Sequence, residues 1–145
     1  MDQPWAYVDT SVLVKRYVGE PGSSQTRGLL RRHRVLSSAI APVEALSALA
    51  RRRGAGDLAE RDFVAIANRM HKDRAHWTLV EVSPLVLNRA EQFIMEPGVR
   101  TLDAIHLASA VTIQAALGIP IPFLTGDARQ QDAAARLGMD VLWVG

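Results

Sequence analysis

Four acidic side chains, far apart along the chain, each stand where a strand-like apolar run gives way to a predicted helix or lie in a helix's first turn. They are Asp9, Glu44, Asp103 and Asp127. In a parallel sheet such helix starts gather at one edge. Two carboxylates about 4 Å apart repel by roughly 4 kcal/mol at an effective dielectric near 20, so four together need protons or cations. The sequence therefore predicts a divalent metal site at this edge.

Oxygen ligands indicate which metal and which chemistry such a site would use. They suit Mg²⁺ or Mn²⁺ rather than Zn²⁺, and Mg²⁺ usually keeps several waters. A bound ion makes water easier to deprotonate and offsets charge at a scissile phosphate. One ion leaves the four carboxylates with surplus negative charge, so RNA would need a second ion or nearby cations. Arg100, Lys15 and Arg16 are candidates, with solvated surface charge as the simpler explanation for each.

Each acid also has a purely structural explanation. An acid in the first turn of a helix stabilises it by about 0.3–1 kcal/mol, which covers Glu44 and Asp103. Asp127 can be an N-cap, and Asp9 can bond to the helix start that follows it. A non-catalytic RNA-binding module, in which the acids are only caps, therefore stays open as an alternative.

Alternating strand-like and helical segments would position these acids. Strands are predicted at residues 5–9, 35–40, 79–83, 123–125 and 141–144. Helices are predicted through 12–17, from Pro42 to near residue 53, from residue 57 through 70, from Pro84 to the Pro97-Gly98 pair, at 101–117 and at 128–137. Thr10 or Ser11 is the expected cap of the first, and Asp57 with Glu60 resembles a capping box. The pattern predicts an α/β fold with a mostly parallel five-stranded sheet.

Length and composition narrow the class of protein. With 145 residues, 48% of them apolar, the chain is expected to form a single domain over residues 1–145. It has no cysteine, which excludes disulfides and thiolate metal sites. The first residues lack the basic and then apolar pattern of a signal peptide, and no apolar stretch is long enough to span a bilayer. A cytoplasmic protein without membrane contact is expected.

Basic residues are unevenly distributed. Fifteen of the 17 are arginine, and residues 27–53 contain seven arginines and only one acid, Glu44. Arginine binds phosphate through a planar fork, which favours an RNA partner. A codon bias towards arginine explains the composition equally well, with Arg51, Arg52 and Arg53 simply suiting the end of a helix.

Four segments of this sequence resemble the PIN-domain proteins, and within them the VapC toxins of bacterial toxin–antitoxin pairs: YVDTSVLVK at 7–15, APVEALSAL at 41–49, RTLDAIHLA at 100–108 and FLTGD at 123–127. The resemblance implies a PIN-like three-layer fold with helices on both faces of the sheet. It also implies a Mg²⁺- or Mn²⁺-dependent ribonuclease, with Asp9, Glu44, Asp103 and Asp127 as catalytic and metal-binding residues. The implied partners are an RNA substrate, a small VapB-like antitoxin that inhibits the enzyme, and a second copy in a homodimer.

Several further side chains could assist the site. Thr10, Ser11 and Thr125 could orient carboxylates or waters, yet capping and turns explain them almost as well. Asp132, one helical turn after the least secure ligand Asp127, could assist or simply be exposed. His106 could bond to a ligand carboxylate, although a histidine in an apolar helix is more often a packed residue.

Other functions remain possible at this level. A housekeeping PIN-type RNA-processing nuclease would show the same acids. A haloacid dehalogenase-like phosphatase also has an aspartate after its first strand, but it expects a second one where this chain has Ser11. The helices around Leu46 and Leu49 and around Phe63 and Ile66 could form an arm that binds an amphipathic partner helix.

Overall fold

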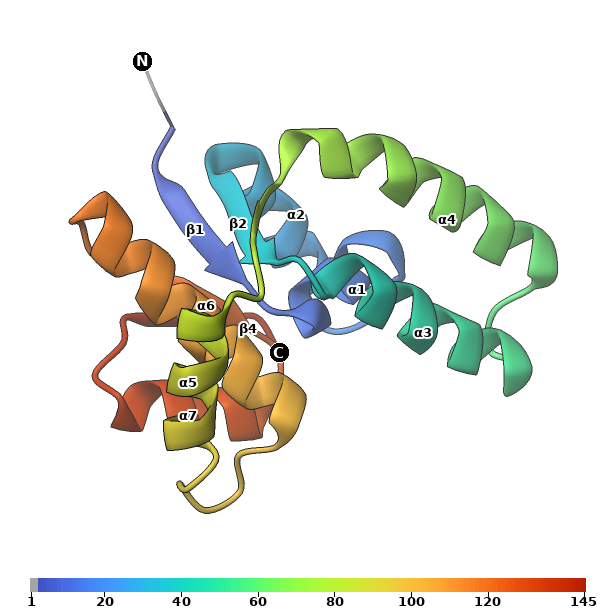
Figure 1. The fold of residues 1–145 in the computed structure, drawn as a ribbon. Coiled ribbons are helices and arrows are strands. Elements are labelled where there is room, and N and C mark those ends of the chain that lie inside the picture. Colours follow the sequence, from blue (N-terminus) through green and yellow to red (C-terminus); the bar gives the residue numbers. More distant parts are fainter. Residues whose placement is uncertain (1–2) are drawn as a thin grey trace.

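Five short parallel strands run through the middle of the computed structural model, which describes residues 3–145 (Figure 1). Met1 and Asp2, on which the expectation about a signal peptide partly rests, lie outside the described residues. The strands follow the order β3-β2-β1-β4-β5, and each neighbouring pair is parallel. Their bounds are β1 (Trp5–Val8), β2 (Arg34–Ser38), β3 (Thr78–Val80), β4 (Phe123–Thr125) and β5 (Val141–Trp143). The predicted five-stranded parallel sheet is confirmed.

Seven α-helices of the described part cover both faces of this sheet (Figure 1). They are α1 (Thr10–Tyr17), α2 (Ser23–Arg32), α3 (Ala41–Gly54), α4 (Glu60–Asp73), α5 (Pro84–Phe93), α6 (Thr101–Leu117) and α7 (Ala128–Arg136), with a 3₁₀ turn at Arg74–His76. The predicted three-layer α/β fold is therefore confirmed as well.

Side chains that alternate along β1 divide the core into two halves. Tyr7 belongs to the half shared with α5, α6 and α7, where it stacks on Phe123 with ring centroids 5.4 Å apart. Ala6 and Val8 belong to the other half, which is shared with α1 and α3. A strand that is buried on both faces needs apolar residues at consecutive positions, as parallel sheets commonly show. β1 is consequently the central strand to which both helical layers are attached.

Two of the predicted helix N-caps differ from those in the structure. Asp9, rather than Thr10 or Ser11, is the N-cap of α1, and its side chain accepts a bond from the Val12 amide. The predicted capping box of Asp57 and Glu60 is wrong, because α4 begins at Glu60 after Ala59, which makes no side-chain cap. Each error came from selecting a capping residue by its type alone, whereas the helix started one or more residues away from the expected position.

Some predicted boundaries extend too far, and one helix was not predicted. β2 ends at Ser38 and β3 at Val80, since the following residues already turn into α3 and α5. Helix α5 ends at Phe93, before the predicted stop at Pro97-Gly98. Helix α2 contains Gly28 and several residues of poor helix propensity, so the sequence alone does not predict a helix there. Its Leu29 and Leu30 pack against the core, and tertiary burial compensates for the weak local preference.

Helices α3 and α4 project together from the sheet as an arm (Figure 1). Leu49 and Met70 are buried in it, whereas Val43 and Val64 are exposed on its surface. Within residues 3–145, no helix combines the length and apolar character needed to cross a membrane.

Candidate active site

The carboxyl edge of the sheet brings together the starts of four helices. Asp9 follows β1 and caps α1, while Asp127 follows β4 and caps α7. Glu44 lies in the first turn of α3, and Asp103 lies in the first turn of α6. Because β1, β2 and β4 are parallel, these positions, up to 118 residues apart in the sequence, reach one edge. All four acids lie at helix starts, where the positive end of the helix dipole favours a carboxylate.

Asp9 is the most enclosed of the four acids. Its side chain is buried, and one carboxylate oxygen accepts bonds from the Ser11 hydroxyl and the Val12 amide. The Thr125 hydroxyl donates to the other oxygen and so links β4 to β1. Burial raises the pKa of the Asp9 carboxyl, although His106 and the hydroxyls of Ser11 and Thr125 act in the opposite direction. This carboxylate is thus held in place by donors on α1 and β4 and carries an unfavourable buried charge.

His106 connects the acids to the core. Its Nε2 lies 2.8 Å from Glu44 Oε1, and its Nδ1 lies 2.8 Å from the Tyr7 hydroxyl oxygen. Burial raises the pKa of the Tyr7 hydroxyl well above its ordinary value, which keeps its proton available for donation to Nδ1. The imidazole proton then lies on Nε2 and is donated to Glu44. Thr10 also donates to Glu44 Oε1, at 2.8 Å, so two donors orient this carboxylate.

Asp103 and Asp127 form the more open side of the site. Asp103 accepts a bond from the Arg100 amide at 3.4 Å, and Asp127 accepts one from the Arg129 amide at 2.9 Å. The pKa of the half-buried Asp103 is raised first by burial and further by the negative charge of Asp127. The two carboxylates therefore act on each other electrostatically, which is the repulsion that a cation would relieve.

The candidate supporting residues are found in three kinds of environment. Thr10, Ser11 and Thr125 all bond directly to Asp9 or Glu44, and Ser11 also accepts the Gly126 amide at 2.9 Å. Arg100 contributes its main chain to the cap of α6. Asp132 is exposed and pairs with Arg136 at 3.5 Å, as the surface alternative predicts.

The two cations proposed near the first acid have other roles. The Lys15 ammonium is largely buried, and it donates to the Glu20 carboxylate at 3.2 Å and to the Pro21 carbonyl at 2.8 Å. Arg16 lies over the Tyr17 ring, 5.2 Å from its centroid. Neither side chain makes an ion pair with the four acids within the described residues.

The donor chemistry of this edge fits a hard divalent cation, since all four candidate ligands are carboxylates. Across residues 3–145, no three or more Asp, Glu or His side chains are arranged as a ligand set. Hydroxyl donors occupy both oxygens of Asp9, while Thr10 and His106 occupy one oxygen of Glu44. These donors offset part of the negative charge of the two carboxylates.

Sequence reasoning missed two contributors to this edge. Tyr7 reads as an ordinary core aromatic, and only the folded chain reveals its bond to His106. Gly126 leaves room for Lys15, because a Cβ atom at this position would lie 2.3 Å from Lys15 Cε. A glycine directly before the last acid was the only signal in the sequence for such a close approach.

Comparison with known proteins identifies relatives of this chain. The PIN domain family model matches residues 6–136. Ribonuclease VapC46 of Mycobacterium tuberculosis (strain ATCC 25618 / H37Rv) is 38% identical over 137 residues, which are 94% of this chain and 95% of that protein. The predicted resemblance to PIN-domain proteins and VapC toxins is confirmed.

Solved structures share the fold at lower identity. A toxin–antitoxin complex from Klebsiella pneumoniae matches with a TM-score of 0.66 and 15% identity, covering 97% of this chain and 98% of that one. Mycobacterium tuberculosis VapC20, described as a sarcin-ricin loop cleaving toxin, matches with a TM-score of 0.64 and 20% identity, covering 90% and 94%. At these identities the likeness shows the fold.

Proposed function

This chain belongs to the PIN-domain family, and from that premise we propose that it is a metal-dependent endoribonuclease, the toxin of a VapBC-type toxin–antitoxin pair. The observation that carries the proposal is the gathering of Asp9, Glu44, Asp103 and Asp127 at one sheet edge, with His106 as a shared neighbour of three of them. The 38% identity to Ribonuclease VapC46 over nearly the full length supports RNA as the substrate.

Asp9, Glu44, Asp103 and Asp127 are the residues that would hold Mg²⁺ or Mn²⁺. When bound, the ion supplies Lewis acidity towards the phosphodiester and makes water easier to deprotonate. The protein's own contribution is to keep the carboxylates oriented. Ser11 and Thr125 hold the two oxygens of Asp9, and Thr10 with His106 holds Glu44. A carboxylate held in this way loses little freedom on binding an ion or a substrate.

The raised pKa values of Asp9 and Asp103 support a cation at this site. Both shifts arise first from burial, and Asp127 adds like-charge repulsion at Asp103. A divalent ion would remove both disadvantages at once, since it replaces lost solvation and compensates the repulsion. Positioned carboxylates that disfavour their own charge are typical of functional sites.

An inhibitory antitoxin, a homodimer and a cytoplasmic location complete the proposal. The Klebsiella pneumoniae match is a toxin–antitoxin complex, which supports a small protein partner for this chain. The α3–α4 arm exposes Val43 and Val64, and such side chains would suit an amphipathic segment of that partner. A housekeeping nuclease of the same family would keep the acids but need no neighbouring antitoxin, so co-purification with the product of the adjacent gene separates the two.

Cleavage of total cellular RNA by the purified protein tests the enzymatic part of the proposal. The reaction is run with Mg²⁺, with Mn²⁺ and with chelator, and Asp103→Asn is compared with Asp140→Asn. Asp140 is an exposed acid that precedes β5 at the opposite edge of the sheet, so it controls for the change of charge. Discrete fragments that require metal and disappear only in Asp103→Asn are expected. Equal cleavage by both variants, or cleavage in chelator, would contradict the proposal and favour a module that only binds RNA.

A further inference from the structure

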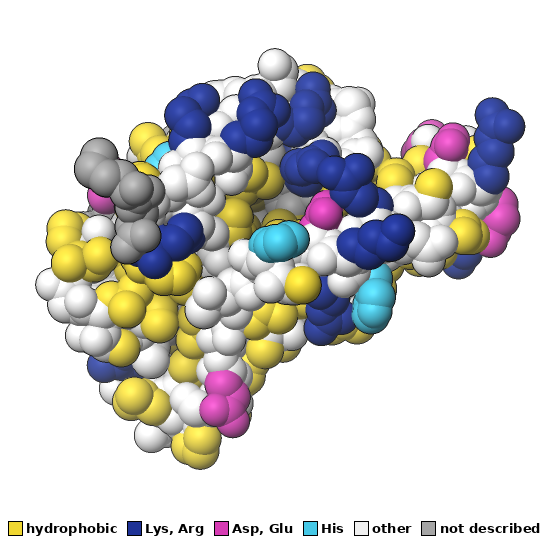
Figure 2. Space-filling view, turned by 90° about the horizontal axis from the view of Figure 1, so that it is seen from above, with side chains coloured by type: hydrophobic (Ala, Val, Ile, Leu, Met, Phe, Trp, Pro, Cys, Tyr) yellow, Lys and Arg dark blue, Asp and Glu magenta, His cyan; other side chains and the backbone are white. Residues whose placement is uncertain are grey.

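A hollow of about 390 Å³ opens at the amino edge of the sheet, away from the acids. We call it the arginine hollow, and it is lined among others by Arg16, Arg27, Arg31, Arg34, Tyr17 and Trp77. Figure 2 shows this face: basic side chains surround a depression whose floor is apolar. Four separate stretches of chain form the lining: Gln3 before β1, the second half of α1, α2 with the start of β2, and the end of α4 with the residues that follow it.

The arginines of this hollow lack carboxylate partners. Within residues 3–145, no acid forms an ion pair with Arg16, Arg27 or Arg31, and no hydrogen bond is made by the guanidinium groups of Arg27 and Arg31. Arg27 is nevertheless half-buried. A partly desolvated guanidinium whose five donors find no acceptor in the described chain is prepared to receive an external anion.

Asp73 is the one acid among the described residues that line the hollow, and donors already bind its carboxylate. Its two oxygens accept bonds from the Tyr17 hydroxyl at 2.7 Å and from Arg69 at 3.1 Å. Burial opposes its charge, but these two donors prevail and hold the pKa of Asp73 below its usual value. The Asp73 charge acts on Arg69 and also on Arg16. Four arginines of the lining face this one described acid, so the net charge around the hollow is positive.

The remaining walls suit the rest of a nucleotide. Leu30 and Trp77 are half-buried and supply apolar surface, which lies over the buried side chains of Leu13 and Val35. Ligand sites commonly combine such surface with a few charged groups and have volumes of roughly 300–1,000 Å³. Arginine forks bind phosphate in a bidentate manner, and aromatic rings accept any base. The combination favours a phosphate joined to a base over a simple inorganic anion.

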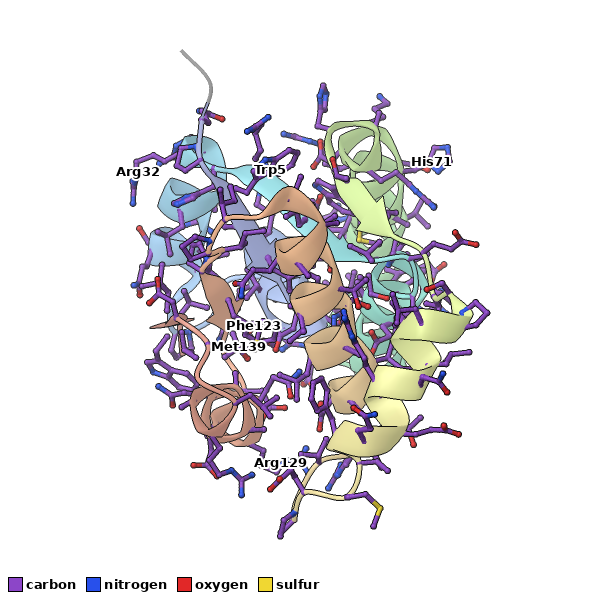
Figure 3. The ribbon with its side chains drawn as sticks, turned by 60° about the vertical axis from the view of Figure 1, so that its left-hand side comes forward. Trp5, Arg32, His71, Phe123, Arg129 and Met139 are labelled. Atoms are coloured by element: carbon purple, nitrogen blue, oxygen red, sulfur yellow. The ribbon has the colours of Figure 1, made fainter. Side chains whose placement is uncertain are left out.

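The arginine hollow is separate from the candidate active site. Arg34 begins β2 and Asp9 follows β1, so the length of the sheet, about 13 Å at four residues, lies between them. Figure 3 shows the same separation, with Trp5 at the start of β1 and Arg129 in the first turn of α7 at opposite ends of the molecule. One mononucleotide cannot occupy both sites, whereas a flexible RNA strand of several nucleotides can.

We propose that the arginine hollow binds the phosphate of a nucleotide, as a second site apart from the acidic edge. The nucleotide belongs either to an RNA strand that continues from the cleavage site or to a free mononucleotide. As an RNA contact the hollow rests on the proposed function, because it would hold the substrate at a distance from the scissile bond. As a site for a free nucleotide it stands independently of the nuclease.

Binding without metal tests this proposal. The full-length protein in chelator is titrated calorimetrically with adenosine, with adenosine 5′-monophosphate and with a short single-stranded oligoribonucleotide, over a range of salt concentrations. The double variant Arg27→Gln, Arg31→Gln is compared with Arg51→Gln, Arg61→Gln, whose arginines are on α3 and α4 outside the hollow. Circular dichroism melting of each variant confirms that the comparison involves folded proteins.

Phosphate-bearing probes are expected to bind and adenosine is not. The hollow variant should lose about tenfold in affinity, and its log–log salt slope for the oligoribonucleotide should fall by about 1.4, or roughly 0.7 for each arginine. Tighter binding of the oligoribonucleotide than of the mononucleotide identifies an RNA strand as the source, and equal affinities identify a free nucleotide. Wild-type affinity in the hollow variant, or equal losses in both variants, would overturn the proposal. Because no metal is present, a failure to cleave RNA does not affect this outcome.

Discussion

The two edges of one sheet carry opposite chemistry. At the carboxyl edge, four acids stand at the starts of α1, α3, α6 and α7, whereas at the amino edge arginines of the last turns of α1 and α2 border a hollow. Helices that connect parallel strands point their amino ends towards the carboxyl edge, where the helix dipole is positive, and their carboxyl ends the other way. The topology itself therefore provides a favourable location for acids at one edge and for cations at the other.

Two aspartates show how differently the edges treat the same side chain. Asp9 is buried among neutral hydroxyl donors, and its pKa is raised chiefly by that burial. Asp73 is also penalised by burial, but Tyr17 and Arg69 bond to it and lower its pKa. The carboxyl edge therefore holds a buried negative charge that a cation would stabilise. At the amino edge the carboxylate already has its donors, and the arginines there are available to an anion. Four predictions test the comparison, beginning with the largest expected effect.

Asp9→Asn is expected to reduce RNA cleavage by roughly 10²–10³-fold, since a central charged group of the site is lost. The same variant should be more resistant to urea at neutral pH. A carboxyl whose folded pKa is raised destabilises the native state above that pKa, and the penalty vanishes below the unfolded value of about 3.9. Urea midpoints near pH 8 and near pH 4 check this sign. A variant that is less stable near pH 8 would show that Asp9 is not under electrostatic stress.

His106→Leu is expected to weaken Mn²⁺ binding by about 10–100-fold, the usual effect of removing a group that orients a ligand. The variant removes the Nε2 donor from Glu44, and isothermal titration calorimetry measures the result without any RNA. Tyr7→Phe, which removes only the bond to Nδ1, should have a smaller effect in the same direction. Wild-type Mn²⁺ affinity in His106→Leu would assign the histidine to packing alone.

Asp73→Asn is expected to lower the free energy of unfolding by about 1 kcal/mol near neutral pH, a value that allows for partial exposure. Its lowered folded pKa stabilises the native state above the unfolded value of about 3.9, and the contribution is lost as the pH falls through the folded pKa. The wild-type and variant urea curves should therefore converge in acid. Asp62→Asn, an exposed change on the same helix, serves as the control. Persistent divergence in acid would place the effect in packing.

Gly126→Ala is expected to destabilise the protein by about 1 kcal/mol, the smallest of these effects. The added Cβ would displace the Lys15 side chain from its contacts with Glu20 and Pro21. Thermal melting is compared with Gly54→Ala, where a Cβ meets nothing within 4 Å and a neutral or slightly stabilising effect is expected. Equal melting temperatures for the two variants would show that Lys15 adapts without loss.

Local signals in the sequence were sufficient to predict that the strands run parallel. They also predicted the helix starts that carry the four acids. They failed where structure depends on distant partners. Helix α2 forms because Leu29 and Leu30 reach the core, despite the glycine within it. The roles of Tyr7 and His106 depend on a bond between residues 99 positions apart.

The arginine hollow illustrates the same difficulty on a larger scale. The excess of arginine was visible in the sequence, but a codon bias towards arginine explained it equally well. Only the folded chain brings Arg16, Arg27 and Trp77 around one depression from three segments. The amino-acid composition showed an excess of positive charge, but only the tertiary structure shows that part of it surrounds one hollow.

The central place of β1 has a consequence for the timing of protein synthesis. This strand is synthesised before the other four, yet one of its two neighbours, β4, is made more than a hundred residues later. The Thr125 hydroxyl that holds Asp9 spans 116 positions. Contacts of such sequence separation form late, because the intervening chain must first be ordered. A nascent chain therefore carries an incomplete acidic edge until β4 and the residues directly after it have been made, and the proposed nuclease would lack its complete site up to that point.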